Sequence, residues 1–105
     1  MTYPDDRDQS PEVNLALDEE VLFRVLARRN RLLGEWAAGL MGLSEAETDA
    51  YTKDLVRADF EGGGGKDVVL KLLGDLTAAG VEVDEGRIRD ALKDKLVEAR
   101  RQLIG

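Results

Sequence analysis

The chain has 105 residues, of which 43% are hydrophobic and 35% charged, a balance that suits one soluble domain with a modest core. It contains no cysteine and no histidine, which excludes disulfides, thiol nucleophiles, zinc sites built on these residues and histidine-based catalysis. The formal net charge is −7. This argues against a nucleic-acid partner, because such proteins gain affinity by neutralising phosphates. We therefore expect a protein that is not an enzyme and does not bind nucleic acid.

The N-terminal stretch MTYPDDRDQSPE is acidic and polar, so it lacks the basic start and the apolar core of a signal peptide. The least polar run, residues 32–43, is interrupted by Glu35. It is also too short for a bilayer, which takes about 20 residues. We expect a cytoplasmic protein that is not inserted in a membrane.

Residues 1–17 contain both prolines, Pro4 and Pro11, and few apolar side chains. So little of this segment can be buried that ordering it would be costly. We expect a flexible N-terminal arm over residues 1–17, disordered or only partly helical, and a helical domain over residues 18–105.

A long helix is predicted from Asp18, which suits an N-cap, with Glu19 and Glu20 in the first turn where the helix dipole favours acids. At 100° per residue, its apolar side chains form two neighbouring stripes. The first stripe collects Leu22, Val25, Leu26, Leu33, Trp36, Ala37 and Leu40, and the second Phe23, Ala27, Gly34 and Met41. A helix this widely apolar should be central, with Trp36 in the core.

Three more helices are predicted. Gly42 ends the first helix, and Ser44 and Glu47 form a capping box for a second that runs to about Phe60. A third helix follows the glycine run and is closed by Gly80, and a fourth is capped by an aspartate at position 84. Their expected buried positions are Tyr51, Leu55, Val56, Ala58, Phe60, Val69, Leu72, Leu73, Leu76, Ile88, Leu92, Leu96, Ala99 and Leu103. No alternation typical of strands is sustained, so the fold is predicted to be all-α, a small four-helix bundle.

The segment EGGGGKD could be mistaken for a phosphate-binding loop of the form G-x-x-x-x-G-K-[ST]. Phe60 stands where the first glycine is required, and Asp67 replaces the hydroxyl residue after Lys66. We interpret the run as a flexible connection between helices. A calcium-loop pattern that begins at Asp75 also fails, because Gly86 stands where the bidentate glutamate is needed. No metal site is expected.

A basic ridge, defined by Arg24, Arg28 and Arg31, follows one face of the first predicted helix. It has two interpretations. The ridge can be a solvated face on which Glu20–Arg24 and Arg31–Glu35 form i,i+4 pairs, each contributing only a few tenths of a kcal/mol. Alternatively, it can dock to an acidic partner surface.

Arg29 differs from the ridge because it falls within the apolar stripe. Either its aliphatic stem packs while the guanidinium reaches solvent, or the guanidinium meets a buried carboxylate such as Asp59 or Asp54.

Several blocks of the sequence follow a specific family pattern. The most distinctive is ARRNRLLGEWAAG at 27–39, accompanied by DDR at 5–7, DEE at 18–20, ADF at 58–60 and DLTAAGVEV at 75–83. On these blocks, which span nearly the whole chain, the sequence resembles the zeta subunit of the alphaproteobacterial F-type ATP synthase.

The resemblance implies a four-helix bundle that inhibits ATP hydrolysis. In the family, an N-terminal segment becomes helical, enters the catalytic α/β interface and blocks reverse rotation, while the bundle docks outside. It implies the α, β and γ subunits as partners, a peripheral place at the inner membrane when bound, and weak ADP or ATP binding that no motif locates here. We expect a monomer when the protein is free. The candidate partner-binding residues are Asp5, Asp6, Arg7, Arg24, Arg28 and Arg31.

The arm departs from the family pattern. Inhibitory members carry a helix-compatible, basic-aromatic run between DDR and Asp18, whereas this chain has DQSPEVNLAL. Pro11 inside a helix would cost ~3 kcal/mol, unless the helix begins at Pro11 itself, where proline is tolerated. We expect weak inhibition. The alternatives are a nucleotide-binding helical bundle that regulates something else, and an adaptor unrelated to the synthase.

Overall fold

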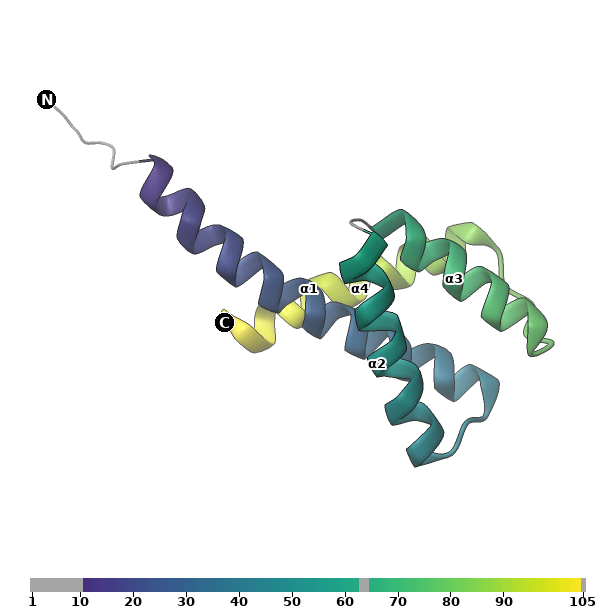
Figure 1. The fold of residues 1–105 in the computed structure, drawn as a ribbon. Coiled ribbons are helices and arrows are strands. Elements are labelled where there is room, and N and C mark those ends of the chain that lie inside the picture. The colour runs from purple at the N-terminus through teal and green to yellow at the C-terminus, as the bar shows by residue number, and fades with distance from the viewer. Residues whose placement is uncertain (1–10, 63–64, 105) are drawn as a thin grey trace, which may run out of the picture.

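The structure, a computed structural model, describes the backbone of residues 11–62 and 65–104 and the side-chain environments of residues 19–62 and 67–104. No strand occurs within these ranges. The predicted all-α, four-helix architecture is confirmed. The helices are α1 (Pro11–Met41), α2 (Glu45–Gly62), α3 (Gly65–Ala78) and α4 (Glu85–Leu103), as Figure 1 shows.

The prediction that the first helix starts at Asp18 is wrong, because α1 begins at Pro11. Proline suits the first helical position, where its missing N–H has no intrahelical partner and its φ is already helical. Glu12 follows it directly, and a negative charge is favourable near the positive end of the helix dipole. Pro11 therefore fits the first position of α1 as the structure describes it.

The ends of the helices follow the local signals in the sequence. Gly42 and Gly80 adopt φ values of 73° and 81°, a left-handed conformation that carries no steric penalty without a Cβ. The N–H of Glu47 donates to Ser44 Oγ at 3.2 Å, and the N–H of Ser44 donates to Glu47 Oε1 at 2.8 Å. Asp84 caps α4 by accepting a backbone N–H at 2.8 Å. These predicted caps are confirmed.

The central helix is α1, as predicted. It contacts each of the other three helices, whereas α2 and α4 do not contact each other in the described part of the chain. The first turns of α1 extend away from the other helices (Figure 1). The buried core cluster consists of Leu33, Ala37, Leu55, Val68, Val69, Leu72, Leu76, Ile88 and Ala91.

Five side chains expected on the apolar stripes or at buried positions are exposed: Leu22, Phe23, Leu40, Phe60 and Leu103. Leu22 is 52% exposed because it precedes Val25, the first buried residue among the described side chains of α1. Leu40 lies at the exposed end of the same helix. Phe60 is 69% exposed and packs its ring edge against Phe23, with the ring centroids 5.5 Å apart. These two aromatic rings therefore pair at the surface.

Two other aromatic side chains join helices at the edge of the core. Trp36, expected in the core, is half-buried against it, and the Arg87 guanidinium of α4 lies 6.0 Å from the centre of its ring. Tyr51 of α2 donates its hydroxyl to Asp75 Oδ2 of α3 at 2.7 Å. Burial, followed by the hydrogen bond and the charge of Asp75, raises the pKa of Tyr51 far above its usual value, so the hydroxyl remains a donor.

A buried network of Arg29, Asn30 and Asp59 joins α1 to α2. Arg29 and Asp59 are 7% and 9% exposed, and Arg29 Nη2 lies 3.4 Å from Asp59 Oδ2. Asn30 donates from Nδ2 to the same oxygen at 2.7 Å and accepts from Arg29 Nε at 3.0 Å. Burial lowers the pKa of Arg29, with the charge of Asp59 opposing that shift. The hypothesis that Arg29 meets Asp59 is confirmed.

A close approach between α1 and α2 depends on Gly34. A Cβ at this position would lie 2.8 Å from Thr52 Cγ2 and 3.1 Å from Thr52 Cα. Thr52 is itself buried, so it has little room to yield. By contrast, a Cβ at Gly39 of the same helix would meet nothing within 4 Å.

Replacing Gly34 with alanine should therefore lower the free energy of unfolding. Overpacking against the Thr52 backbone costs about 1–3 kcal/mol, which outweighs the roughly 1 kcal/mol that alanine gains over glycine in a helix. Gly39→Ala, the matched control, should stabilise the protein. Urea unfolding followed by circular dichroism measures both, and equal stabilisation by the two substitutions would contradict the close approach.

Removing the carboxylate of the buried network should be far more damaging than removing an exposed one. Asp59→Ala leaves the Arg29 charge buried without its acid, at an expected cost of about 3–5 kcal/mol. Asp54→Ala on the same helix breaks an exposed pair with Arg57 and should cost less than about 1 kcal/mol. Chemical unfolding of the two variants decides the matter, and similar losses would show that the network contributes no special stability.

Candidate partner-binding site

Two arginines of the basic ridge form loose ion pairs on the surface. Arg24 Nη2 lies 4.0 Å from Glu20 Oε1, and Arg31 Nε lies 4.0 Å from Glu35 Oε2, as the i,i+4 interpretation predicts. Arg31 also reaches across to α2, where its Nη2 lies 3.8 Å from Asp49 Oδ1. All these side chains are about half exposed or more. Such pairs contribute at most about 1 kcal/mol, so an acidic partner could replace them at little cost.

Arg28, the third arginine of the ridge, is exposed and turns toward α4. Its Nη1 donates to Gln102 Oε1 at 2.7 Å. The ridge on α1 therefore contacts α2 through Arg31 and α4 through Arg28. The other candidate residues, Asp5, Asp6 and Arg7, lie outside the part of the chain that the structure describes.

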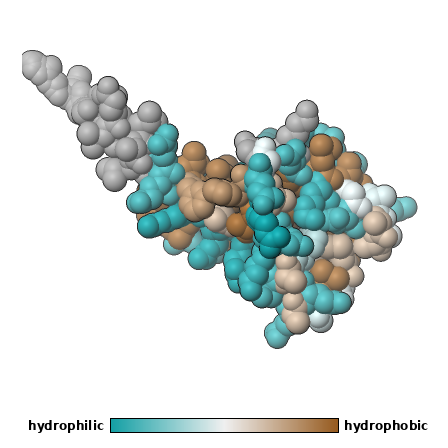
Figure 2. Space-filling view, in the orientation of Figure 1, coloured by the Kyte–Doolittle hydropathy of each residue, from teal (hydrophilic) through white to brown (hydrophobic). Residues whose placement is uncertain are grey.

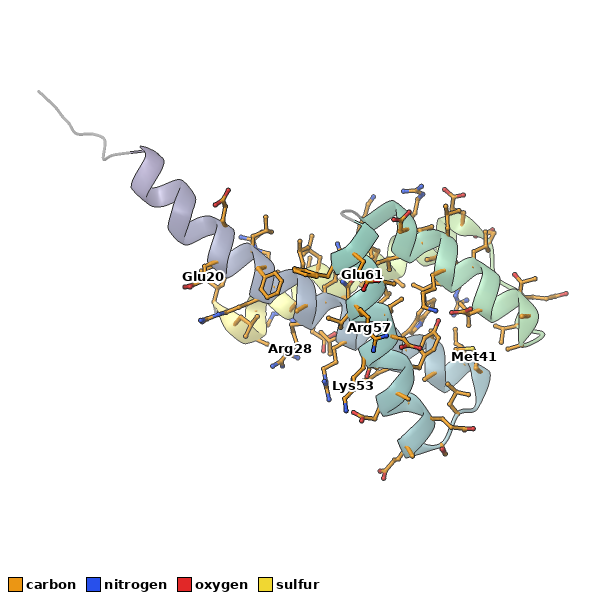
Figure 3. All side chains as sticks on the ribbon, viewed as in Figure 1. Glu20, Arg28, Met41, Lys53, Arg57 and Glu61 are labelled. Carbon is orange, nitrogen blue, oxygen red and sulfur yellow. The ribbon has the colours of Figure 1, made fainter. Side chains whose placement is uncertain are left out.

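Two further cations, Lys53 and Arg57, come from α2. They pair with carboxylates of their own helix at 3.0 Å and 3.6 Å, and both side chains are mostly exposed. Figure 3 shows Lys53 and Arg28 pointing toward the same side of the molecule. The i,i+4 spacing of Lys53 and Arg57 could have shown from the sequence that the two cations lie on one face of α2. The packing of α2 on α1 was needed to place them in one groove with Arg31.

An apolar groove of about 600 Å³ lies between α1 and α2. Its apolar lining comes from Phe23, Leu26 and Ala27 of α1 and from Val56 and Phe60 of α2. The rings of the two phenylalanines are inclined at 77°, an edge-to-face arrangement that aromatic pairs favour. We call this feature the α1–α2 groove.

The α1–α2 groove has a polar base and a cationic rim. The buried network contributes to its lining, together with the exposed side chains of Arg31, Lys53 and Arg57. One oxygen of the network, Asp59 Oδ1, is buried and has no hydrogen-bonding partner among the described residues. Four cationic residues and one acidic residue thus line the groove, although the chain as a whole carries a net charge of −7.

Apolar side chains gather on the surface where α1 leaves the other helices, with hydrophilic side chains around them (Figure 2). Patches of this kind on soluble proteins often mark sites of interaction. Among the described residues of these elements, α1 exposes three large apolar residues before Val25, α2 exposes one, and the end of α4 exposes two. They are Val21, Leu22, Phe23, Phe60, Leu103 and Ile104.

Other classes of site find less support in the described residues. None of the described helices has the length and apolar character required to cross a membrane. Within the same residues, no group of three or more acidic side chains is arranged to hold a metal ion. α2 extends to Gly62 and α3 begins at Gly65, so two of the four glycines belong to helices, and Asp67 stands in the first turn of α3. The residues between the two helices, at which a flexible connection is predicted, lie outside the described part of the chain.

Comparison with known proteins identifies the family of this chain. The family described as ATPase inhibitor subunit zeta matches residues 1–102. A protein whose structure was determined by NMR in solution is 39% identical, with a TM-score of 0.68 and with 78% of this chain and 93% of that chain covered. No curated protein sequence matches the chain. Because the family match includes the arm, the ridge and all four helices, the chain belongs to the ATPase inhibitor subunit zeta family.

Proposed function

We propose that this protein is a regulatory subunit that binds the α, β and γ subunits in the catalytic sector of the F-type ATP synthase and inhibits ATP hydrolysis only weakly. The observation that carries this proposal is the family match over residues 1–102, which includes both the arm and the bundle. A subunit of this kind acts by binding, so it needs exposed, complementary surfaces and no catalytic group. When bound, the protein would lie at the cytoplasmic face of the inner membrane.

The shape of α1 supports binding to a large partner. At about 1.5 Å per residue, the stretch from Pro11 to Arg24 is roughly 20 Å long, and its described side chains, 19–24, are all exposed. In Figure 1 the first turns of this stretch stand clear of the bundle, and Phe23 near its end contacts Phe60 of α2. A projecting helix can enter a cleft of a partner while the remaining helices stay outside it.

The charged residues divide between the two parts of this arrangement. We assign Asp5, Asp6 and Arg7 to contacts made by the arm inside the catalytic sector. We assign Arg24, Arg28 and Arg31 to contacts with an acidic surface at its entrance. Their internal partners are exposed, so exchanging them for the carboxylates of a partner costs little.

The sequence of the arm supports weak inhibition. Because α1 begins at Pro11, a helix that continued to residues 5–7 would hold this proline in its interior, at a cost of about 3 kcal/mol. The stretch DQSPEVNLAL also lacks lysine and aromatic side chains. It therefore offers neither charge attraction nor the large anchors that dominate binding energy at interfaces.

The strength of inhibition can be measured on a purified synthase that responds to other zeta subunits. The unaltered chain should inhibit ATP hydrolysis weakly or not at all, and Pro11→Ala should recover at most part of the effect because the anchors are still missing. Direct binding of the chain, measured in parallel, separates weak inhibition from absence of association. Potent inhibition that disappears when residues 1–17 are deleted would contradict the proposal.

The basic ridge can be tested by charge reversal. Arg24→Glu with Arg28→Glu should weaken association with the synthase at least tenfold, because repulsion replaces attraction at the same positions. The melting temperature should change little, since both side chains are exposed. Arg89→Glu is the control, because Arg89 is a similarly exposed arginine that pairs with Glu85 at i,i+4 in α4. A large loss of stability with association intact would make the ridge structural instead.

A further inference from the structure

We propose that the α1–α2 groove is a docking site for an acidic amphipathic helix in the catalytic sector of the synthase. In this arrangement an apolar side chain of the partner packs against the exposed surfaces of the Phe23 and Phe60 rings. Acidic side chains of the same helix then meet Arg31, Lys53 and Arg57. This inference rests on the proposed function and adds to it the site on this chain and the chemistry of the partner segment.

The aromatic pair is the first reason. Phe23 and Phe60 are 54% and 69% exposed and in contact with each other, so a large apolar area faces water on a highly charged chain. Aromatic side chains of this size are frequent anchors of protein interfaces. The pair lies where α1 leaves the other helices, so a partner that takes up the projecting part of α1 would pass directly over it.

The shape of the site favours a helix as the occupant. The groove is bounded by two helices, and a third helix can lie between them with its apolar side chains inserted, a common mode of recognition. A small molecule fits less well, because ligand pockets bury about 70–90% of the surface of their ligand. Here the two rings stand mostly in solvent.

The charge of the lining selects an acidic occupant. Four of the lining residues are cationic and only Asp59 is acidic. Asp59 is already engaged with Arg29 and Asn30. The carboxylates that pair with Lys53 and Arg57 do not line the groove, and these pairs are exposed. A partner carboxylate can therefore reach the cations of the rim without displacing a buried group.

Photo-crosslinking identifies the occupant directly. Benzoylphenylalanine replaces Phe60 in one variant of the full chain and Leu70 in a control, because Leu70 is similarly exposed but lies on α3. Each variant is irradiated with the purified catalytic sector, and crosslinked peptides are sequenced by mass spectrometry. We expect position 60, and not position 70, to crosslink to a helical segment with apolar residues at i and i+3 or i+4 flanked by aspartate or glutamate.

A charge-reversal pair completes the test. Lys53→Glu with Arg57→Glu should raise the Kd for the catalytic sector at least tenfold. Arg89→Glu with Lys93→Glu, which makes the same change in net charge at i,i+4 positions of α4, should raise it less than about threefold. Equal effects of the two double variants, a crosslink to a second copy of this chain, or a crosslink to a segment without acids would overturn the inference while leaving the proposed function intact. If the unaltered chain does not bind the catalytic sector, the inference and the proposed function are both overturned.

Discussion

The buried network between Arg29, Asn30 and Asp59 fixes how α1 lies on α2, and the candidate site depends on that placement. A charged guanidinium without its acid would be costly at this depth, so α2 cannot slide along α1 and leave Arg29 unpaired. Nearby, the absence of a side chain at Gly34 lets the two helices approach closely at Thr52. Together these two contacts set one register for the helix pair. Because α1 also contacts α3 and α4, it is the helix against which the others are placed.

Through that register, the buried network in the interior determines which side chains of α1 and α2 meet at the surface. It places Phe60 against Phe23 and brings Lys53 and Arg57 of α2 into the same groove as Arg31 of α1. The apolar walls and the cationic rim of the α1–α2 groove are therefore products of packing. The ridge on α1 is a property of one helix, whereas the groove exists only when α1 and α2 are correctly paired.

The features that the sequence predicts well are local ones. The glycine at the end of α1, the capping box and the aspartate cap of α4 each depend on residues within a few positions, and all are confirmed. The sequence left two environments open for Arg29, because a guanidinium within an apolar stripe either reaches solvent or meets a buried carboxylate such as Asp59 or Asp54. The packing of α2 on α1 decides for Asp59. The start of α1 at Pro11 was harder to predict, since proline reads equally as a helix breaker or a first residue. The exposure of Phe60 and the groove follow from the register of two helices, which periodicity alone does not give.

In the proposed function, the protein contacts the catalytic sector of the synthase through the projecting part of α1 and the neighbouring face of α2. Hydrogen–deuterium exchange of the full chain, free and with excess purified catalytic sector, tests it most directly. We predict that binding slows exchange in residues 11–31 of α1 and 53–60 of α2, while α3 and the first half of α4 are unchanged. Slower exchange confined to α3 and α4, with the first turns of α1 exchanging as rapidly as in the free protein, would contradict the account.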